Sequence, residues 1–135
     1  MGTVIKINEG IVEDAAQLVP LARWLEWREA GQVPHPGSGV WLEPDDDFDA
    51  LLPDLDRLTL IAVNFPVFTD GRGYSVARLL RERHGYRREL RAVGDVLRDQ
   101  LYFMRRCGFD AFALRADQDA ELALRAFDDY SVSYQ

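Results

Sequence analysis

The sequence predicts an α/β fold of four consecutive strand–helix units, preceded by an N-terminal β-hairpin and helix. Residues 58–65 (LTLIAVNF) form a nearly unbroken apolar run, which is typical of a parallel strand covered on both faces. Segments with apolar residues at helical spacing follow the predicted strands, and glycines or capping residues mark their ends. Because strands and helices alternate at short spacing, we expect right-handed crossovers and a parallel sheet.

The first 39 residues predict a hairpin, a helix and a loop. Residues 3–7 and 11–13 flank the turn Asn8–Gly10, as in a β-hairpin. Pro20 stands where a helix begins and Gly31 where it ends. Two prolines and two glycines within residues 32–39 then predict a loop.

From Val40 onward the pattern becomes regular. The predicted strands cover residues 40–42, 58–65, 89–93 and 109–114. The helices are expected to begin at the acidic run Asp45–Asp47, at Ser75, at Asp95 and at Asp117, the last with Phe127 on its inner face. We therefore predict a single α/β domain over residues 1–135, with a variable hairpin and helix segment (1–39), a βα core (40–127) and a tail (128–135). Tyr130 and Tyr134 indicate that the tail docks as a strand or strap.

Two sheet architectures fit this order of elements. One is an open, flavodoxin-like sandwich, and the other resembles half of a (β/α)₈ barrel with the hairpin covering one edge. A half-barrel leaves one apolar sheet face uncovered, so it requires either a homodimer or a cap from the N-terminal segment.

The composition narrows the function classes. Cys107 is the only cysteine, and His35 and His84 are the only histidines, so we expect no intrachain disulfide and no metal site. Redox chemistry would need an organic cofactor or a partner's metal centre. No apolar run approaches the roughly 20 residues that span a bilayer, and no secretory signal opens the chain, so we expect a cytoplasmic protein.

The net charge of −7 is unevenly distributed. Residues 1–70 carry 4 basic and 13 acidic side chains, whereas residues 71–135 carry 12 and 10. Ten of the fifteen arginines lie between Arg72 and Arg106. Arginine suits carboxylate, phosphate or sulfate, although a high-GC genome alone also enriches it. The acidic balance and the absence of an RNA-binding motif argue against nucleic acid.

Candidate site residues are those expected at the carboxyl ends of the strands, where open α/β sheets bind ligands. They are Glu43 and Asp45, residues 64–75, Gly94 and Asp95, and residues 115–117. The most unusual is the long connection from Phe65 to the run Asp70, Gly71, Arg72, Gly73, Tyr74 and Ser75. Free amides at a helix start favour an anion, with the Arg72 guanidinium and the Ser75 hydroxyl as further contacts.

This loop has a structural interpretation as well. It lacks the lysine of a Walker loop and the third glycine of a dinucleotide fingerprint. In the structural interpretation Asp70 pairs with Arg72 to hold the loop, the glycines satisfy turn geometry, and Ser75 only caps the helix.

Arg78 and Arg91 are the further candidate anion contacts, and Asp70 and Asp95 the candidate acid–base groups. Arg91 lies within a predicted strand and needs a partner, for which Asp95 or Asp99 is expected. Asp95 is also expected as a plain helix cap.

Two further residues receive structural predictions. Cys107 follows two arginines, which can favour a thiolate, but its helical face predicts a buried structural residue. Gln100 leans inward on the same helix, where it can satisfy a loop carbonyl.

From residue 65 onward the chain contains, in order, Asp-Gly-Arg-Gly-Tyr-Ser, Ala-Arg-Leu-Leu-Arg, Glu-Leu-Arg-Ala, Gly-Asp-Val-Leu and Arg-Cys-Gly-Phe-Asp. This combination closely resembles a proteobacterial family of uncharacterised proteins, the domain-of-unknown-function 934 family, with the resemblance clear from about Val40. Members are typically encoded beside assimilatory sulfite reductase and are often labelled probable oxidoreductases of sulfite reduction.

The resemblance implies a role in sulfur assimilation, and two functions follow from it. One is an accessory or binding protein that acts with sulfite reductase or its electron donor. The other is a small oxidoreductase or an enzyme that handles a small oxyanion through the residue 70–75 loop. The cofactor is left open by the residues.

Overall fold

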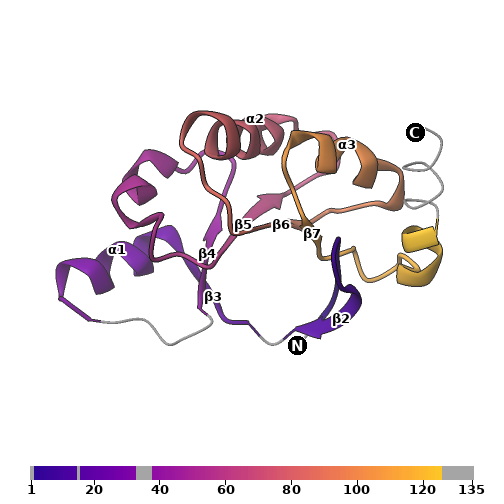
Figure 1. The fold of residues 1–135 in the computed structure, drawn as a ribbon, viewed down its shortest axis with the longest axis horizontal. Coiled ribbons are helices and arrows are strands. Elements are labelled where there is room, and N and C mark those ends of the chain that lie inside the picture. The colour runs from indigo at the N-terminus through magenta and orange to yellow at the C-terminus, as the bar shows by residue number, and fades with distance from the viewer. Residues whose placement is uncertain (1, 15, 33–37, 126–135) are drawn as a thin grey trace.

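The computed structural model describes residues 2–14, 16–32 and 38–125. They form one mixed seven-stranded sheet in the order β2-β1-β7-β6-β5-β4-β3, with helices packed against it (Figure 1). The α/β prediction is therefore confirmed. The predicted tail with Tyr130 and Tyr134, together with Phe127 and part of the 32–39 loop, lies outside the described residues.

The elements have the following bounds. The strands are β1 (Gly2–Lys6), β2 (Gly10–Asp14), β3 (Leu18–Pro20), β4 (Gly39–Leu42), β5 (Leu60–Phe65), β6 (Glu89–Gly94) and β7 (Ala111–Phe112). The α-helices are α1 (Leu21–Glu29), α2 (Arg72–Arg78) and α3 (Leu101–Cys107), and residues 120–125 are also helical. Two 3₁₀ helices, η1 (Phe48–Asp54) and η3 (Arg98–Gln100), and the π-helical continuation of α2, η2 (Leu79–Arg83), complete the set.

The strands from β3 to β7 run parallel and follow one another in chain order. This is the order of strands in half of a (β/α)₈ barrel, and it differs from the flavodoxin order, in which the chain reverses direction within the sheet. Four regular strand–helix units are not present. A 3₁₀ helix follows β4, since Pro53 inside η1 has no N–H to donate and its ring would clash within an α-helix.

The remaining differences lie at the ends of elements. The short strand β3 was not predicted, because Pro20 ends it and at the same time precedes α1. The last helix is capped by Asp119 and not by Asp117, since the Asp119 carboxylate accepts the Leu122 N–H at 3.1 Å. The predicted strand 109–114 is shortened to Ala111–Phe112.

The predicted hairpin is confirmed, and it extends the parallel sheet. β1 pairs antiparallel with β2 on one side and with β7 on the other, so it covers the edge of β7. The register places Lys6 opposite Ala111 and Ile5 opposite Phe112. The N-terminal hairpin therefore covers one edge of the parallel sheet, as expected for the half-barrel arrangement.

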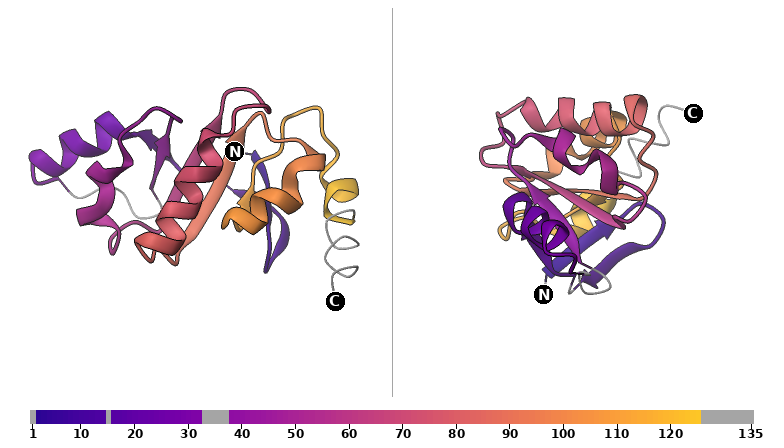
Figure 2. Two further views of the ribbon diagram at one scale, coloured as in Figure 1. Left: turned by 90° about the horizontal axis from the view of Figure 1, so that it is seen from above. Right: turned by 90° about the vertical axis from the view of Figure 1, so that its left-hand side faces the viewer.

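The seven strands curl strongly, because the two edge strands are close in sequence. β2 ends at Asp14 and β3 begins at Leu18, so residues 15–17 connect opposite edges of the sheet. That connection spans at most about 14 Å, whereas six strand spacings in a flat sheet cover about 29 Å. The sheet consequently has a concave inner face, and α2 and α3 lie together on its other side (Figures 1 and 2).

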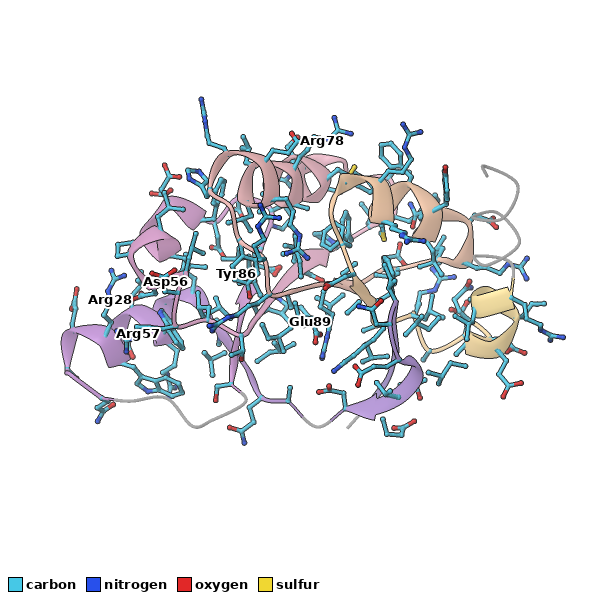
Figure 3. All side chains as sticks on the ribbon, in the orientation of Figure 1. Arg28, Asp56, Arg57, Arg78, Tyr86 and Glu89 are labelled. Carbon is cyan, nitrogen blue, oxygen red and sulfur yellow. The ribbon has the colours of Figure 1, made fainter. Side chains whose placement is uncertain are left out.

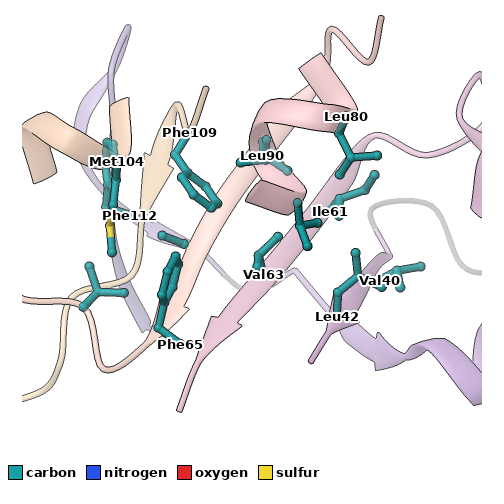
Figure 4. Close-up of a cluster of buried hydrophobic side chains, with 14 of the residues drawn as sticks. Val40, Leu42, Ile61, Val63, Phe65, Leu80, Leu90, Met104, Phe109 and Phe112 are labelled. Carbon is teal, nitrogen blue, oxygen red and sulfur yellow. The ribbon is translucent and has the colours of Figure 1, made fainter. Parts of the chain in front are cut away.

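The apolar core fills the space between the sheet and the helices. Ile61, Val63 and Phe65 project from β5 toward this layer and are almost fully buried (Figure 4). The helices contribute Leu80 and Met104, which are fully buried against the same strands. Gly73 of α2 lies so close to β5 that an added Cβ would meet the Phe65 ring at 2.8 Å.

We expect Gly73→Ala to destabilise the protein by about 1–3 kcal/mol, because the methyl group would overpack the buried Phe65 ring. Gly71→Ala is the matched control two residues earlier, where an added Cβ meets nothing within 4 Å. Urea unfolding of both variants measures the difference. Equal stability of the two would contradict the packing of α2 on β5.

Candidate functional site

The predicted anion loop is held together by its own charges. The Asp70 carboxylate accepts hydrogen bonds from Arg72 Nε at 3.1 Å and Nη2 at 2.7 Å, and from the Arg72 backbone N–H at 3.0 Å. The hydrogen bond from the Arg72 side chain lowers the pKa of Asp70 to about 2. Asp70 is therefore an ionised partner of Arg72, which does not suit a general acid near neutral pH.

The start of the following helix differs from the prediction. α2 begins at Arg72 with Gly71 before it, so Ser75 lies inside the helix and does not cap it. The prediction missed this because the Asp70 carboxylate satisfies the first helical amide, which leaves Ser75 no capping role. The pairing of Asp70 with Arg72 agrees with the structural interpretation of the loop, whereas the capping role that this interpretation gave to Ser75 is wrong.

Tyr74 is a packing residue. Its ring lies between those of Phe65 and Phe103, with centroid distances of 5.1 and 4.8 Å. Burial raises the pKa of its hydroxyl. Together with Gly73, this residue fixes α2 to the sheet and to α3.

Arg78 and Arg91, the other predicted anion contacts, lie on different sides of the sheet. Arg78 is on the helical side, where its Nη2 approaches the buried Sγ of Cys107 at 3.5 Å. Arg91 belongs to β6 and bonds with Glu89, which lies well apart from Arg78 (Figure 3). The predicted set of anion-binding residues is therefore not brought together, whereas the predicted burial of Cys107 is confirmed.

The prediction that Asp95 caps a helix is wrong. Its carboxylate instead joins the loops that follow three strands, β5, β6 and β7. Its Oδ2 accepts the Phe68 backbone N–H at 2.6 Å, and its Oδ1 accepts Arg115 Nη1 at 2.8 Å. Arg115 also donates to both carboxylate oxygens of Asp117, at 2.6 and 2.8 Å. η3 begins only at Arg98, after Leu97, which leaves the Asp95 side chain available to the neighbouring loops.

The loop after β5 is fixed on both sides of Phe68. Asp95 binds the Phe68 N–H, and Gln100 Nε2 donates to the Phe68 carbonyl at 2.6 Å. The predicted role of Gln100 is thus confirmed. Three large apolar residues near these bonds are about half exposed. They are Val67 (53%) and Phe68 (48%) in the loop and Phe103 (49%), one helical turn after Gln100. We call these three residues the apolar patch.

A second cluster of charges lies inside the curled sheet. Arg91 donates from Nε to Glu89 and from Nη2 to Asp14 at 3.1 Å, and Lys6 Nζ lies 3.1 Å from Asp14 and 3.3 Å from Glu89. Only 4% of Arg91 is exposed. The prediction that Arg91 pairs with Asp95 or Asp99 is wrong. Both aspartates follow the carboxyl end of β6, whereas Arg91 lies in the middle of that strand and points inward.

Asp14 was missed as a site residue, since it is far from Arg91 in sequence and lies in the hairpin. Burial opposes its ionisation, but hydrogen bonds from the Ala16 N–H, Lys6 and Arg91 lower its pKa to about 2. The sequence feature that pointed to such a residue was Arg91 itself, because an arginine within a buried strand needs a carboxylate partner.

A cavity of about 400 Å³ opens beside this cluster at the carboxyl ends of the parallel strands. Asp14 and Arg91 line it together with Leu18, Trp41 and Val93, and Arg115 lies on its border. A second hollow of about 550 Å³ shares Thr3, Ala113, Leu114, Arg115 and Ala116 with it. We call the first of these the carboxyl-end cavity.

No group of three or more His, Cys, Asp or Glu side chains suited to a metal ion occurs within residues 2–14, 16–32 and 38–125. In that same part of the chain, no helix has the length and apolar character needed to cross a membrane.

We expect the stability contributed by Asp14 to depend on pH. Since its pKa is lower in the folded than in the unfolded state, its charge contributes about 2 kcal/mol above pH 4, and this is lost as the pH falls toward 2. Asp14→Asn should therefore be less stable than wild type at pH 7 by at least about 2 kcal/mol, and the gap should narrow below pH 4.

Urea unfolding at pH 7, 4 and 3 measures this dependence. Asp56→Asn, at an exposed carboxylate (Figure 3), is the matched control. A stability gap for Asp14→Asn that stays constant between pH 7 and pH 3 would contradict the ion pair.

Comparison with known protein families matches residues 39–135 to the family described as bacterial protein of unknown function (DUF934). No curated protein and no solved structure matches the chain. The match begins where the regular strand pattern begins and includes β4 to β7, the residue 70–75 loop and the Asp95–Arg115 pair. Because it extends over more than half of the sequence, the protein belongs to the DUF934 family.

Proposed function

We propose that this protein is an accessory protein of assimilatory sulfite reduction that binds sulfite reductase or its electron donor. The apolar patch of Val67, Phe68 and Phe103 carries the proposal. Three large apolar side chains on neighbouring elements, each about half exposed, are typical of a surface that another protein covers. The choice of partner rests on the resemblance of residues 65–109 to proteins encoded beside sulfite reductase.

The patch is held in place by specific bonds. The Asp95 carboxylate and the Gln100 amide fix the two sides of the Phe68 peptide, and Tyr74 packs against the ring of Phe103. A loop fixed in this way loses little conformational entropy when a partner covers it. Pre-ordering therefore favours recognition by the loop over a purely structural role for its exposed side chains.

The surface around the helical layer is strongly basic. Between residues 65 and 109 only Glu82 and Asp99 are exposed carboxylates, compared with eight exposed arginines. These arginines are Arg72, Arg78, Arg83, Arg87, Arg88, Arg98, Arg105 and Arg106. A face of this charge steers an acidic partner toward the patch, although the whole chain carries a net charge of −7.

The alternative is a small oxidoreductase or an enzyme that handles a small oxyanion such as sulfite at the 70–75 loop. It has less support at that loop, because the Arg72 guanidinium is already bound by Asp70. A thermal-shift screen with sulfite, sulfate, adenosine phosphosulfates, flavins and nicotinamides distinguishes the two functions. Stabilisation by an oxyanion that is abolished by Arg72→Ala would favour the enzyme.

We expect the protein to form a complex with purified assimilatory sulfite reductase or with its electron-donor subunit at low salt. Phe68→Ser combined with Phe103→Ser should weaken the complex at least about tenfold, because central aromatic side chains dominate such interfaces. Raising the ionic strength should slow association, since screening weakens steering by the arginines. Native mass spectrometry and biolayer interferometry measure both effects.

Ile11→Ser is the matched control for the patch, since Ile11 is another exposed apolar side chain and lies on the hairpin. It should leave the affinity unchanged. The proposal is overturned if neither sulfite reductase nor its electron-donor subunit binds the wild-type protein at low salt. It is also overturned if Ile11→Ser weakens binding as much as the patch variant does.

A further inference from the structure

The carboxyl-end cavity has the features of a small-molecule site. Its volume of about 400 Å³ lies within the range of ligand pockets, which are mostly apolar with a few polar groups. Leu18, Trp41 and Val93 supply apolar surface, and Asp14 and Arg91 supply the polar groups. The cavity lies at the carboxyl ends of parallel strands, where barrel-like α/β proteins bind their ligands.

The charges in this cavity do not favour an anion. Arg91 and Lys6 are matched by the carboxylates of Asp14 and Glu89, so the inner cluster is neutral. Arg115 at the border is bound by Asp95 and Asp117. Because each guanidinium already has carboxylate partners, an added anion would gain little attraction and would lose its hydration.

A hydrogen-bond donor and an acceptor instead lie side by side. Arg91 Nη2 is 3.1 Å from Asp14 Oδ2, and both residues line the cavity. Within the described part of the chain, Arg91 forms its hydrogen bonds through Nε and Nη2. Its third nitrogen, Nη1, can still donate a hydrogen bond to a ligand. Asp14 Oδ1 accepts one bond, from the Ala16 N–H, and retains capacity for another.

The wall beside this pair is suited to a flat ring. Trp41 lines the cavity from β4, and its Nε1 donates to Glu43 at 3.2 Å, which limits rotation of the indole. Glu43 is held in turn by Asn64 Nδ2 at 2.7 Å. An indole fixed in this way offers a rigid aromatic surface for stacking.

We propose that the carboxyl-end cavity binds an uncharged planar heterocycle with a lactam edge, in which a ring N–H and a ring C=O are neighbours. The N–H donates to the Asp14 carboxylate, the C=O accepts from the Arg91 guanidinium, and the ring lies against Trp41. Binding involves no covalent step. The proposal is independent of the partner-binding function, because none of the patch residues lines this cavity.

Lumazine (pteridine-2,4-dione) tests the proposal, with 1,3-dimethyllumazine as its matched control. The control keeps the ring shape but replaces both lactam N–H groups with N–methyl groups. With the full chain, we expect saturable binding of lumazine below about 1 mM, and binding of the control at least about tenfold weaker. In ¹H–¹⁵N spectra, lumazine should shift the Trp41 indole and the Val93 amide.

A cavity-filling variant tests whether lumazine binds in the carboxyl-end cavity. Ala113→Leu should weaken lumazine binding at least about tenfold, because Ala113 lines the cavity. Ala22→Leu on the exposed side of α1 adds the same side chain elsewhere and should leave binding unchanged.

Three results would overturn the proposal. They are the absence of saturable binding at 1 mM lumazine, equal affinity for lumazine and its dimethyl control, and tighter binding of naphthalene-2-carboxylate than of lumazine. The wild-type protein alone gives these results, so they do not depend on how well a variant folds. We expect the double variant Phe68→Ser, Phe103→Ser to retain lumazine binding, which would show that the cavity binds its ligand independently of the apolar patch.

Discussion

The ion pair between Arg91 and Asp14 joins two parts of the sheet that are distant in both sequence and strand order. Arg91 is on β6 and Asp14 on β2, with β7 and β1 between them. A contact of 3.1 Å across this distance is possible only if the sheet curls. The buried guanidinium is stable because Glu89 and Asp14 neutralise it and Lys6 holds both carboxylates. The shape of the sheet and the charge balance of its interior therefore depend on each other.

The carboxyl ends of the strands are joined by a second set of charges. Asp95 and Arg115 connect the loops after β5, β6 and β7, and Gln100 adds a bond from η3. These bonds order a surface that would otherwise consist of long, independent loops. The apolar patch lies on one of these loops, and Arg115 also borders the carboxyl-end cavity. One network thus holds both candidate functional regions.

The two sides of the sheet differ in their chemistry. The helical side presents most of its arginines to solvent, which gives a basic surface suited to an acidic protein partner. The concave side pairs two positive with two negative groups beside an aromatic wall, and of these four Arg91 is buried while Lys6, Asp14 and Glu89 are partly exposed. A basic outer surface and a charge-balanced inner face are suited to different kinds of ligand.

The sequence by itself determined the fold class, the hairpin, the strands β4 to β6, the end of α3 at Gly108 and the burial of Cys107. These features follow from local patterns, namely apolar runs, helical spacing and glycine at helix ends. The inward position of Gln100 was also predictable from its place on the helical face.

Only the tertiary structure decided which charged groups meet. Arg91 pairs with Asp14 and not with Asp95 or Asp99, and Asp95 binds Arg115 and the Phe68 amide and does not cap a helix. Arg72 binds Asp70, so the predicted anion loop and its distant arginines form no common site. The physical reason is that long-range ion pairs depend on how far the sheet curls, and that curl is set by the close sequence connection of its two edges, which no local pattern encodes.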